Sequence, residues 1–268
     1  MNFYLLIVIA VGVFLAMTGA WAIQRLTGMS GWIDTIWSLT IGVGGSTAVI
    51  LAEGIFARRM TVLVAITAWA LRLAWHIGTR TKFGGEDPRY AKLMEDWGAS
   101  ASWRLFLFLQ VQALAALILI FTVYLAAAND KAYPSGQDFL AALLAAAALI
   151  GETTSDAQLA QFRLTPEAKT DICETGLWYY SRHPNYFFEW LFWCALPVFA
   201  ITNSPVSLLS LLAPALMYWL LVHVSGIPPL EEHMLRSRGE KFRALQRRVN
   251  AFFPGPRKSE TLLKENDQ

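Results

Sequence analysis

The stretch between Gly176 and Glu189 gathers more ionisable and hydrogen-bonding side chains than any other part of this apolar chain. Within it, Pro184 suits the first turn of a helix, where a missing N–H costs nothing, and this places His183 at the helix N-cap. The free N–H groups of that first turn would then lie close to Arg182. A guanidinium beside a helix N-terminus is typical of an anion site, so we expect it to receive a phosphate.

Three side chains follow at intervals of four residues on one face of this predicted helix: Asn185, Glu189 and Trp193. A carboxylate one turn inside a membrane helix is costly without a partner, so Glu189 indicates a functional site. The alternative is that Arg182 and Glu189 are ordinary interfacial residues that stabilise the start of the helix.

Composition indicates a polytopic membrane protein. Of the 268 residues, 55% are hydrophobic and only 16% are charged, whereas about a quarter of a soluble domain is charged. Seven apolar runs have about the length that spans a bilayer, at residues 3–23, 32–52, 60–78, 103–126, 137–161, 186–201 and 206–226. The first run lacks the basic segment and cleavage site of a signal peptide, so we expect it to remain as a helix.

These runs predict an all-α bundle of seven transmembrane helices. We expect a single membrane domain over residues 1–257 and a polar, disordered tail over residues 258–268. Lysine and arginine gather in the loops on one side of the predicted helix bundle. The loops on the other side hold only Arg58, Arg59 and Lys131. The positive-inside rule then predicts an external N-terminus and a cytoplasmic C-terminus. We separately expect the membrane to be a bacterial inner membrane. The basic run of the tail has a second possible use, which is contact with anionic lipid.

The second predicted membrane helix carries an acid, Asp34, between Trp32 and Trp37. Low dielectric favours the protonated form of a carboxyl group, which can donate a hydrogen bond to a carbonyl. We therefore expect Asp34 to border a substrate, with the two tryptophans beside it. The alternative is that Asp34 caps its helix, which aspartate does well.

Cationic side chains recur four residues apart at the end of the third predicted helix: Arg72, His76 and Arg80. Such a row of cationic side chains can guide an anion into the protein. The alternative is that Arg80 only extends its charged end towards water. The fifth predicted helix ends with Asp156 and Arg163 on one face, two turns apart. In a functional interpretation, Asp156 binds hydroxyl or amino groups of a ligand and Arg163 binds a phosphate. The alternative is that these residues only form the amphipathic end of a helix.

Metal chemistry is not indicated. The two cysteines and four histidines of the chain show no spacing typical of a zinc or iron site, and the cysteines form no disulfide pattern.

The C-terminal half resembles the steroid 5α-reductase family, in the Ser155-Asp156 … Arg163 segment, in Gly176-Leu-Trp and in Asn185-Tyr-Phe-Phe-Glu189. The resemblance implies a seven-helix membrane bundle with an NADPH cavity that opens to the cytoplasm. It implies that the cofactor-binding residues include Asp156, Arg163, Asn185 and Glu189 and, by a looser match, Arg182, His183 and Glu231. Apart from the resemblance, we add to the expected cofactor-binding set Arg72 and Arg80, from the row of cationic side chains, and Tyr180.

The catalytic residues of that family match less well. The family uses a glutamate in the second span and a tyrosine in the third, and these positions fall at or near Asp34 and Trp69. An indole can donate a hydrogen bond but cannot supply a proton at neutral pH. Either another group then assists Asp34 or the substrate differs from a steroid enone.

A second family competes. Membrane methyltransferases of the isoprenylcysteine and phospholipid type also carry Arg-His-Pro-x-Tyr and Glu-Glu-x-x-Leu, which here are residues 182–186 and 231–235. Asp156 and Arg163 favour the reductase, because they resemble contacts to a dinucleotide and have no evident role towards S-adenosylmethionine. A transporter or purely structural bundle would leave the polar cluster after Gly176 unexplained.

The sequence therefore predicts an NADPH-dependent reductase of the activated C=C bond of a lipophilic enone. We expect the substrate, a sterol-like or isoprenoid molecule, to enter from the bilayer. The expected partners are this small molecule and membrane lipid, with neither nucleic acid nor an obligate protein partner.

Overall fold

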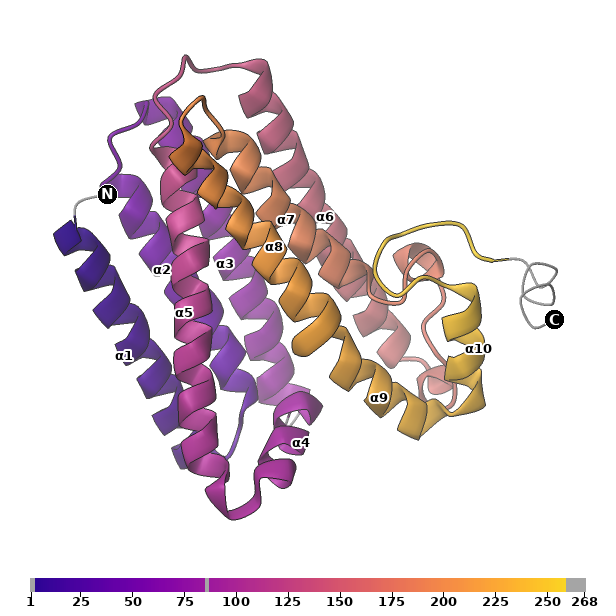
Figure 1. The fold of residues 1–268 in the computed structure, drawn as a ribbon. Coiled ribbons are helices and arrows are strands. Elements are labelled where there is room, and N and C mark those ends of the chain that lie inside the picture. Colours follow the sequence, from indigo (N-terminus) through magenta and orange to yellow (C-terminus); the bar gives the residue numbers. More distant parts are fainter. Residues whose placement is uncertain (1–2, 85–86, 259–268) are drawn as a thin grey trace. The chain divides into compact units, whose positions relative to one another are not determined.

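A computed structural model describes residues 3–84 and 87–258, and the regular structure within them is helical. The principal helices are α1 (Phe3–Thr27), α2 (Gly31–Ile50), α3 (Phe56–Gly84), α4 (Pro88–Trp97), α5 (Ala101–Ala127), α6 (Gly136–Arg163), α7 (Pro184–Ala200), α8 (Leu212–Trp219), α9 (Ile227–Arg238) and α10 (Glu240–Arg248) (Figure 1). The predicted all-α class is confirmed. The predicted tail lies, except for Lys258, outside the described residues.

Six helical segments of the described chain are long and apolar enough to cross a membrane: Tyr4–Thr27, Gly31–Ile50, Phe56–Lys82, Arg89–Ala127, Gly136–Arg163 and Pro205–Arg238. The count differs from the expected seven because α7 has only 17 residues. At about 1.5 Å per residue α7 is shorter than the ~30 Å hydrocarbon core of a bilayer. The protein is thus a polytopic membrane protein, while its orientation stays a prediction.

The chain divides into two compact units. The first unit contains residues 1–145 and 194–216, and the second contains residues 146–193 and 217–268. The division passes through α6, α7 and α8, so each unit holds one part of these helices. The expected single domain stays a prediction.

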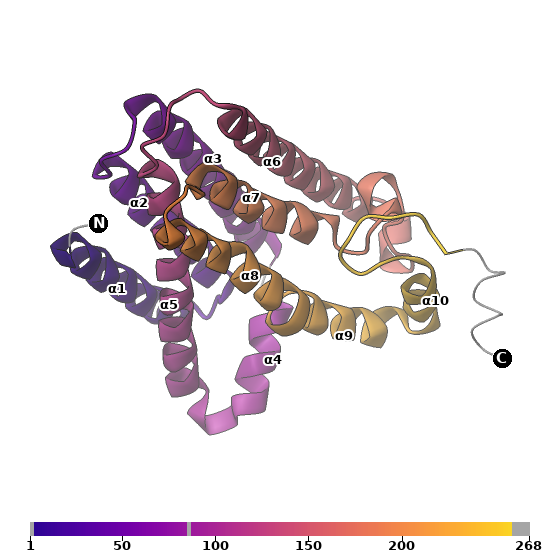
Figure 2. The ribbon, with the colours of Figure 1, turned by 45° about the horizontal axis from the view of Figure 1, so that its top comes forward.

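In the first unit, α2 packs against α1, α3 and α5 (Figures 1 and 2). Two glycines of α2 allow the close approach of α3. A Cβ atom at Gly42 would lie 2.4 Å from the Cβ of Ala70, and one at Gly45 would lie 3.1 Å from Ile66. The glycine-rich run of α2 therefore serves helix packing.

A buried ion pair fixes one end of the first unit. Arg58 is 1% exposed, and its Nε and Nη2 atoms donate to the two carboxylate oxygens of Asp138 at 2.7 and 2.9 Å. The remaining guanidinium donors bind the backbone carbonyls of Asn129, Lys131 and Ala132. Because this network satisfies the arginine, it ties α3 to the loop before α6 without offering a group to a ligand.

In the second unit, the end of α6 packs closely against the start of α7. A Cβ atom at Gly151 would lie 2.4 Å from the ring of Phe188. The turn that precedes α7 is also fixed to α6, because the indole of Trp178 donates to the Ser155 carbonyl at 2.9 Å. These contacts place the stretch that begins at Gly176 against the last turns of α6.

Candidate functional site

The start of α7 agrees with the prediction from its proline. The helix begins at Pro184, and the Phe187 N–H donates to the His183 carbonyl at 3.2 Å, as expected for an N-cap position. One turn further, the indole Nε1 of Trp193 donates to Glu189 Oε1 at 2.9 Å. Both side chains are buried. The carboxylate inside α7 therefore has a donor on its own helix face.

Asp156 of α6 and Asn185 of α7 meet. The Asn185 Nδ2 donates to Asp156 Oδ1 at 3.3 Å, and Asp156 is 8% exposed. The Asn185 Oδ1 is buried and accepts no hydrogen bond from the described residues. An unsatisfied buried acceptor costs about 1–3 kcal/mol, so it marks a position that a ligand donor would complete.

Two further carboxylates lie one turn from this contact. Glu152 precedes Asp156 by four residues on α6, and Glu189 follows Asn185 by four residues on α7. Both glutamates are buried, and α6 and α7 run in opposite directions (Figure 1). The contact of α6 with α7 is therefore rich in hydrogen-bond acceptors, which suits a ligand that carries amide, amino or hydroxyl donors.

The Arg-His-Pro and Glu-Glu motifs meet in the second unit. Glu231 of α9 accepts from Arg182 Nε at 2.7 Å, and its distance to His183 Nε2 is 3.2 Å. Its other oxygen accepts from Gln246 Nε2 at 2.7 Å. Arg182 also donates to the backbone carbonyls of Gln246 and Val249. The arginine expected to bind a phosphate therefore joins the start of α7 to α9 and to the end of α10.

Burial sets the charge of His183. Desolvation lowers the pKa of His183, and the neighbouring Arg182 adds to this effect, while the contact with Glu231 opposes it. The imidazole is therefore neutral at pH 7, and its Nε2–H donates to the carboxylate.

Asp34 is not a helix cap. The N-cap of α2 is Ser30, and Asp34 lies in the first turn of the helix. Its two oxygens accept from the Tyr90 hydroxyl at 2.7 Å and from Arg89 Nη2 at 2.5 Å. The Tyr90 hydroxyl in turn accepts from Gln112 Nε2 at 3.1 Å. Asp34 is thus part of a hydrogen-bond network of α2, α4 and α5.

A second acid extends this network. Asp87 caps α4 by accepting from the Arg89 N–H at 3.0 Å, and it forms ion pairs with the side chains of Arg89 and Arg80. Burial alone would raise the pKa of Asp87, but these two guanidinium groups hold it below its usual range. Arg80, expected to guide a phosphate, is therefore paired within the first unit.

Sequence reasoning missed Arg89 and Tyr90. A signal for their helix exists, because an aspartate followed by a proline is a common helix start, and Asp87 occupies that place. The pattern predicts the first turn of α4, although it does not predict that this turn reaches Asp34 on α2.

The aromatic residues of the predicted active site occupy different environments. Trp69 is fully buried in α3. The Trp37 indole donates to the Gln112 carbonyl at 3.1 Å, and Trp32 is half-buried on α2. On α3, Arg72 is half-buried. Whether these side chains border a substrate stays a prediction.

Two predicted cofactor residues lie at the surface of the second unit. Arg163 is exposed at the end of α6, and Tyr180 is half-exposed. Tyr180 lines an open pocket of about 720 Å³, whose other lining residues are Thr154, Gln158, Glu174, Thr175, Gly176, Leu177 and Tyr179. Asn185 and Glu189 do not line it, and the expected cytoplasm-opening cofactor cavity stays a prediction.

The fold and these buried polar centres define an all-helical polytopic membrane protein. The chain belongs to the family described as a protein of unknown function, DUF1295, whose profile matches residues 20–249. It is also similar to an uncharacterised protein of Schizosaccharomyces pombe, with 26% identity over an alignment 267 residues long. The aligned segments cover 87% of this chain and 75% of the relative. No solved structure matches the chain significantly.

Proposed function

We propose that the protein is an NADPH-dependent reductase of the activated C=C bond of a lipophilic enone. The observation that carries the proposal is the buried, unsatisfied Oδ1 atom of Asn185, next to the carboxylate of Asp156. The DUF1295 family includes steroid 5α-reductase-like membrane proteins, and the resemblance of residues 155–189 to that family supports the same activity.

The acceptors of the second unit fit the nicotinamide half of the cofactor. A nicotinamide carboxamide and its ribose offer N–H and O–H donors, which Asn185 Oδ1, Asp156 and Glu189 are suited to accept. Arg163, two turns after Asp156 and about 10 Å along the helix, is the residue proposed to bind a phosphate. Arg182 has a structural role instead, because a phosphate would have to displace Glu231.

Bound NADPH would supply the hydride for the β carbon of the enone. Negative charge then develops on the carbonyl oxygen, and a positioned donor lowers the barrier. We propose the Tyr90 hydroxyl as this donor: it would exchange its hydrogen bond to Asp34 Oδ1 for one to the carbonyl oxygen and give that oxygen its phenolic proton, which the indole of Trp69 cannot provide. Asp34 would orient the hydroxyl. Arg89 holds Asp34 in place.

Identification of the bound ligand tests the proposal. The full chain, purified in a mild detergent, should retain a dinucleotide that mass spectrometry identifies as NADP(H) in denatured extracts. Protein with Asn185→Ala, prepared in the same way, should retain much less. Recovery of S-adenosylmethionine or S-adenosylhomocysteine, or binding of neither ligand class in titrations, would overturn the reductase.

The methyltransferase is the second candidate. A specific observation favours it, because the contact of Arg182 and His183 with Glu231 joins the two motifs shared with that class. The carboxylates of Asp156 and Glu189 would also suit the ammonium group of S-adenosylmethionine. Titration of one purified sample with both ligands separates the candidates.

A further inference from the structure

The last described part of the chain is strongly basic. Between Ile227 and Lys258 there are eight lysine or arginine residues and three glutamates. On α10 itself, Lys241 and Arg243 are 58% and 61% exposed, and Arg247 is exposed as well. A polar helix face with this excess of positive charge complements a surface of phosphate groups.

The apolar face of α10 is already covered. Phe242, Leu245 and Val249 are buried in a cluster, against which three partly buried residues pack: Ile172, Met234 and Leu235. The helix therefore has no free apolar face to insert between lipid chains. Any contact with a membrane would be made by its charged face, at the level of the headgroups.

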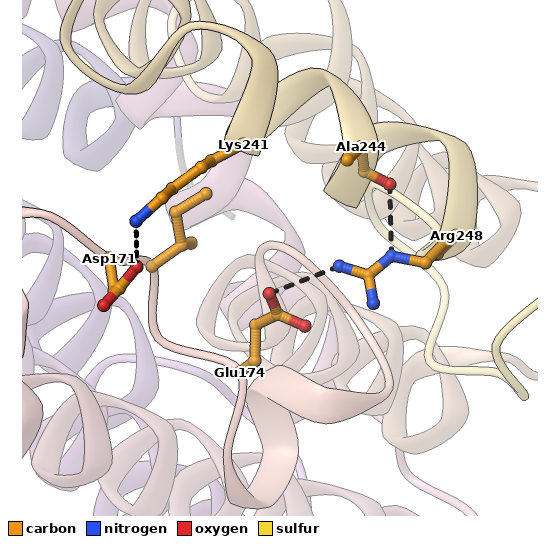
Figure 3. Close-up of a pocket in the computed structure, with 6 residues that line it drawn as sticks. Asp171, Glu174, Lys241, Ala244 and Arg248 are labelled. Carbon is orange, nitrogen blue, oxygen red and sulfur yellow. Dashed lines mark hydrogen bonds and ion pairs between the residues drawn. The ribbon is translucent and has the colours of Figure 1, made fainter.

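The ion pairs on this face are easily exchanged. Lys241 pairs with Asp171 at 2.5 Å, and Arg248 with Glu174 at 3.4 Å, across a pocket of about 320 Å³ (Figure 3). Exposed pairs of this kind contribute little to stability, because water solvates the separated charges well. The basic side chains of α10 can thus turn to an external phosphate at low cost.

Contacts join α10 to the segment that follows a candidate membrane span. Lys241 donates to the Thr170 carbonyl and pairs with Asp171, and these two residues follow soon after Arg163, the end of the candidate span in α6. We propose that the charged face of α10 binds the anionic phospholipid headgroups of the membrane that this chain crosses. This proposal is independent of the reaction catalysed.

Hydrogen–deuterium exchange of the full chain in lipid nanodiscs tests the proposal. We compare nanodiscs of phosphatidylcholine with nanodiscs that contain phosphatidylglycerol as well. The α10 amides should exchange about fivefold more slowly with anionic lipid, the effect of roughly one basic contact. The difference should vanish in 1 M salt, where the Debye length falls to about 3 Å.

The combined substitution of Arg243→Gln and Arg247→Gln should remove the protection, while Lys131→Gln, which changes an exposed lysine of the first unit, should keep it. If the double variant does not fold, the salt series on the unchanged protein decides. Equal exchange in both lipids, protection that survives 1 M salt, or protection by a DNA duplex but not by lipid would overturn the proposal.

Discussion

Each unit buries a polar centre, and the two centres differ in how their hydrogen bonds are completed. In the first unit, both oxygens of Asp34 accept bonds from charged or phenolic donors, Arg89 and Tyr90. In the second unit, the Oδ1 of Asn185 accepts none from the described residues. The difference is confined to the amide and the acid, because Gln112 of the first network also keeps a buried Oε1 that accepts no hydrogen bond from the described residues. An unfilled acceptor gains most when a ligand donor binds. Under the proposed function, proton chemistry belongs to the first centre and cofactor binding to the second.

Asp34→Asn should give the largest effect, because it removes the carboxylate that orients the Tyr90 hydroxyl, the proposed proton donor. If this pair supplies the proton, turnover of a lipophilic enone should fall by about two to four orders of magnitude. NADPH affinity should stay within about threefold, because no contact to the cofactor is lost. NADPH oxidation, followed by absorbance, and a binding titration measure the two quantities. Unchanged turnover would reduce the network of Asp34 to a structural role.

Asn185→Ala should change the affinity for NADPH, whereas Asp34→Asn should change the turnover. Loss of the amide should weaken NADPH binding by about 1–3 kcal/mol, which is roughly fivefold to 150-fold. Stability should fall by no more than about 1 kcal/mol, because the hydrogen bond of that amide to Asp156 is long and its Oδ1 accepts none from the described residues. Titration and thermal unfolding in detergent measure the two effects.

Arg163→Ala tests whether this arginine distinguishes NADPH from NADH. It should weaken NADPH binding by about 1.5–3 kcal/mol, and NADH binding by less if the arginine meets the 2′-phosphate. Equal losses would place Arg163 on the pyrophosphate, and no loss would remove it from the site. An Asn185→Ala protein that binds both cofactors normally would contradict the assignment of the second centre.

The features predicted from the sequence are those that local spacing determines. Pro184 marks the start of α7, and the four-residue interval from Glu189 to Trp193 places donor and acceptor on one helix face. The six candidate spans of the described chain differ from the expected seven for a related reason. The apolar run 186–201 continues the hydropathy pattern, but the helix ends at Ala200 and is too short for a typical span.

The missed features depend on contacts between residues distant in the sequence. Arg89 reaches Asp34 across 55 positions, and Arg182 reaches Glu231 across 49. No periodicity relates such residues, and both acids have other plausible partners among the cationic side chains nearby in sequence. Helix packing selects one partner, so the structure was required to show that Arg182 is internally paired and that Tyr90 accompanies Asp34.

The smallest predicted effect is a pH dependence of the second unit. The pKa of His183 in the folded protein is lowered by burial, so near and below pH 6.5, the usual value of histidine, the unfolded chain binds a proton that the folded chain does not. Stability should therefore be full above this range and fall as pH falls through it. Glu231, which contacts His183, stays ionised there, because burial alone would raise its pKa but its hydrogen bonds with His183 and Arg182 outweigh burial and lower its pKa to about 2. In the His183→Gln variant, the unfolding free energy should change less between pH 7.5 and pH 5.5 than in the unchanged protein. The variant His233→Gln, at an exposed position, should keep the original pH dependence. An unchanged slope in the His183 variant would show that this imidazole does not titrate with unfolding.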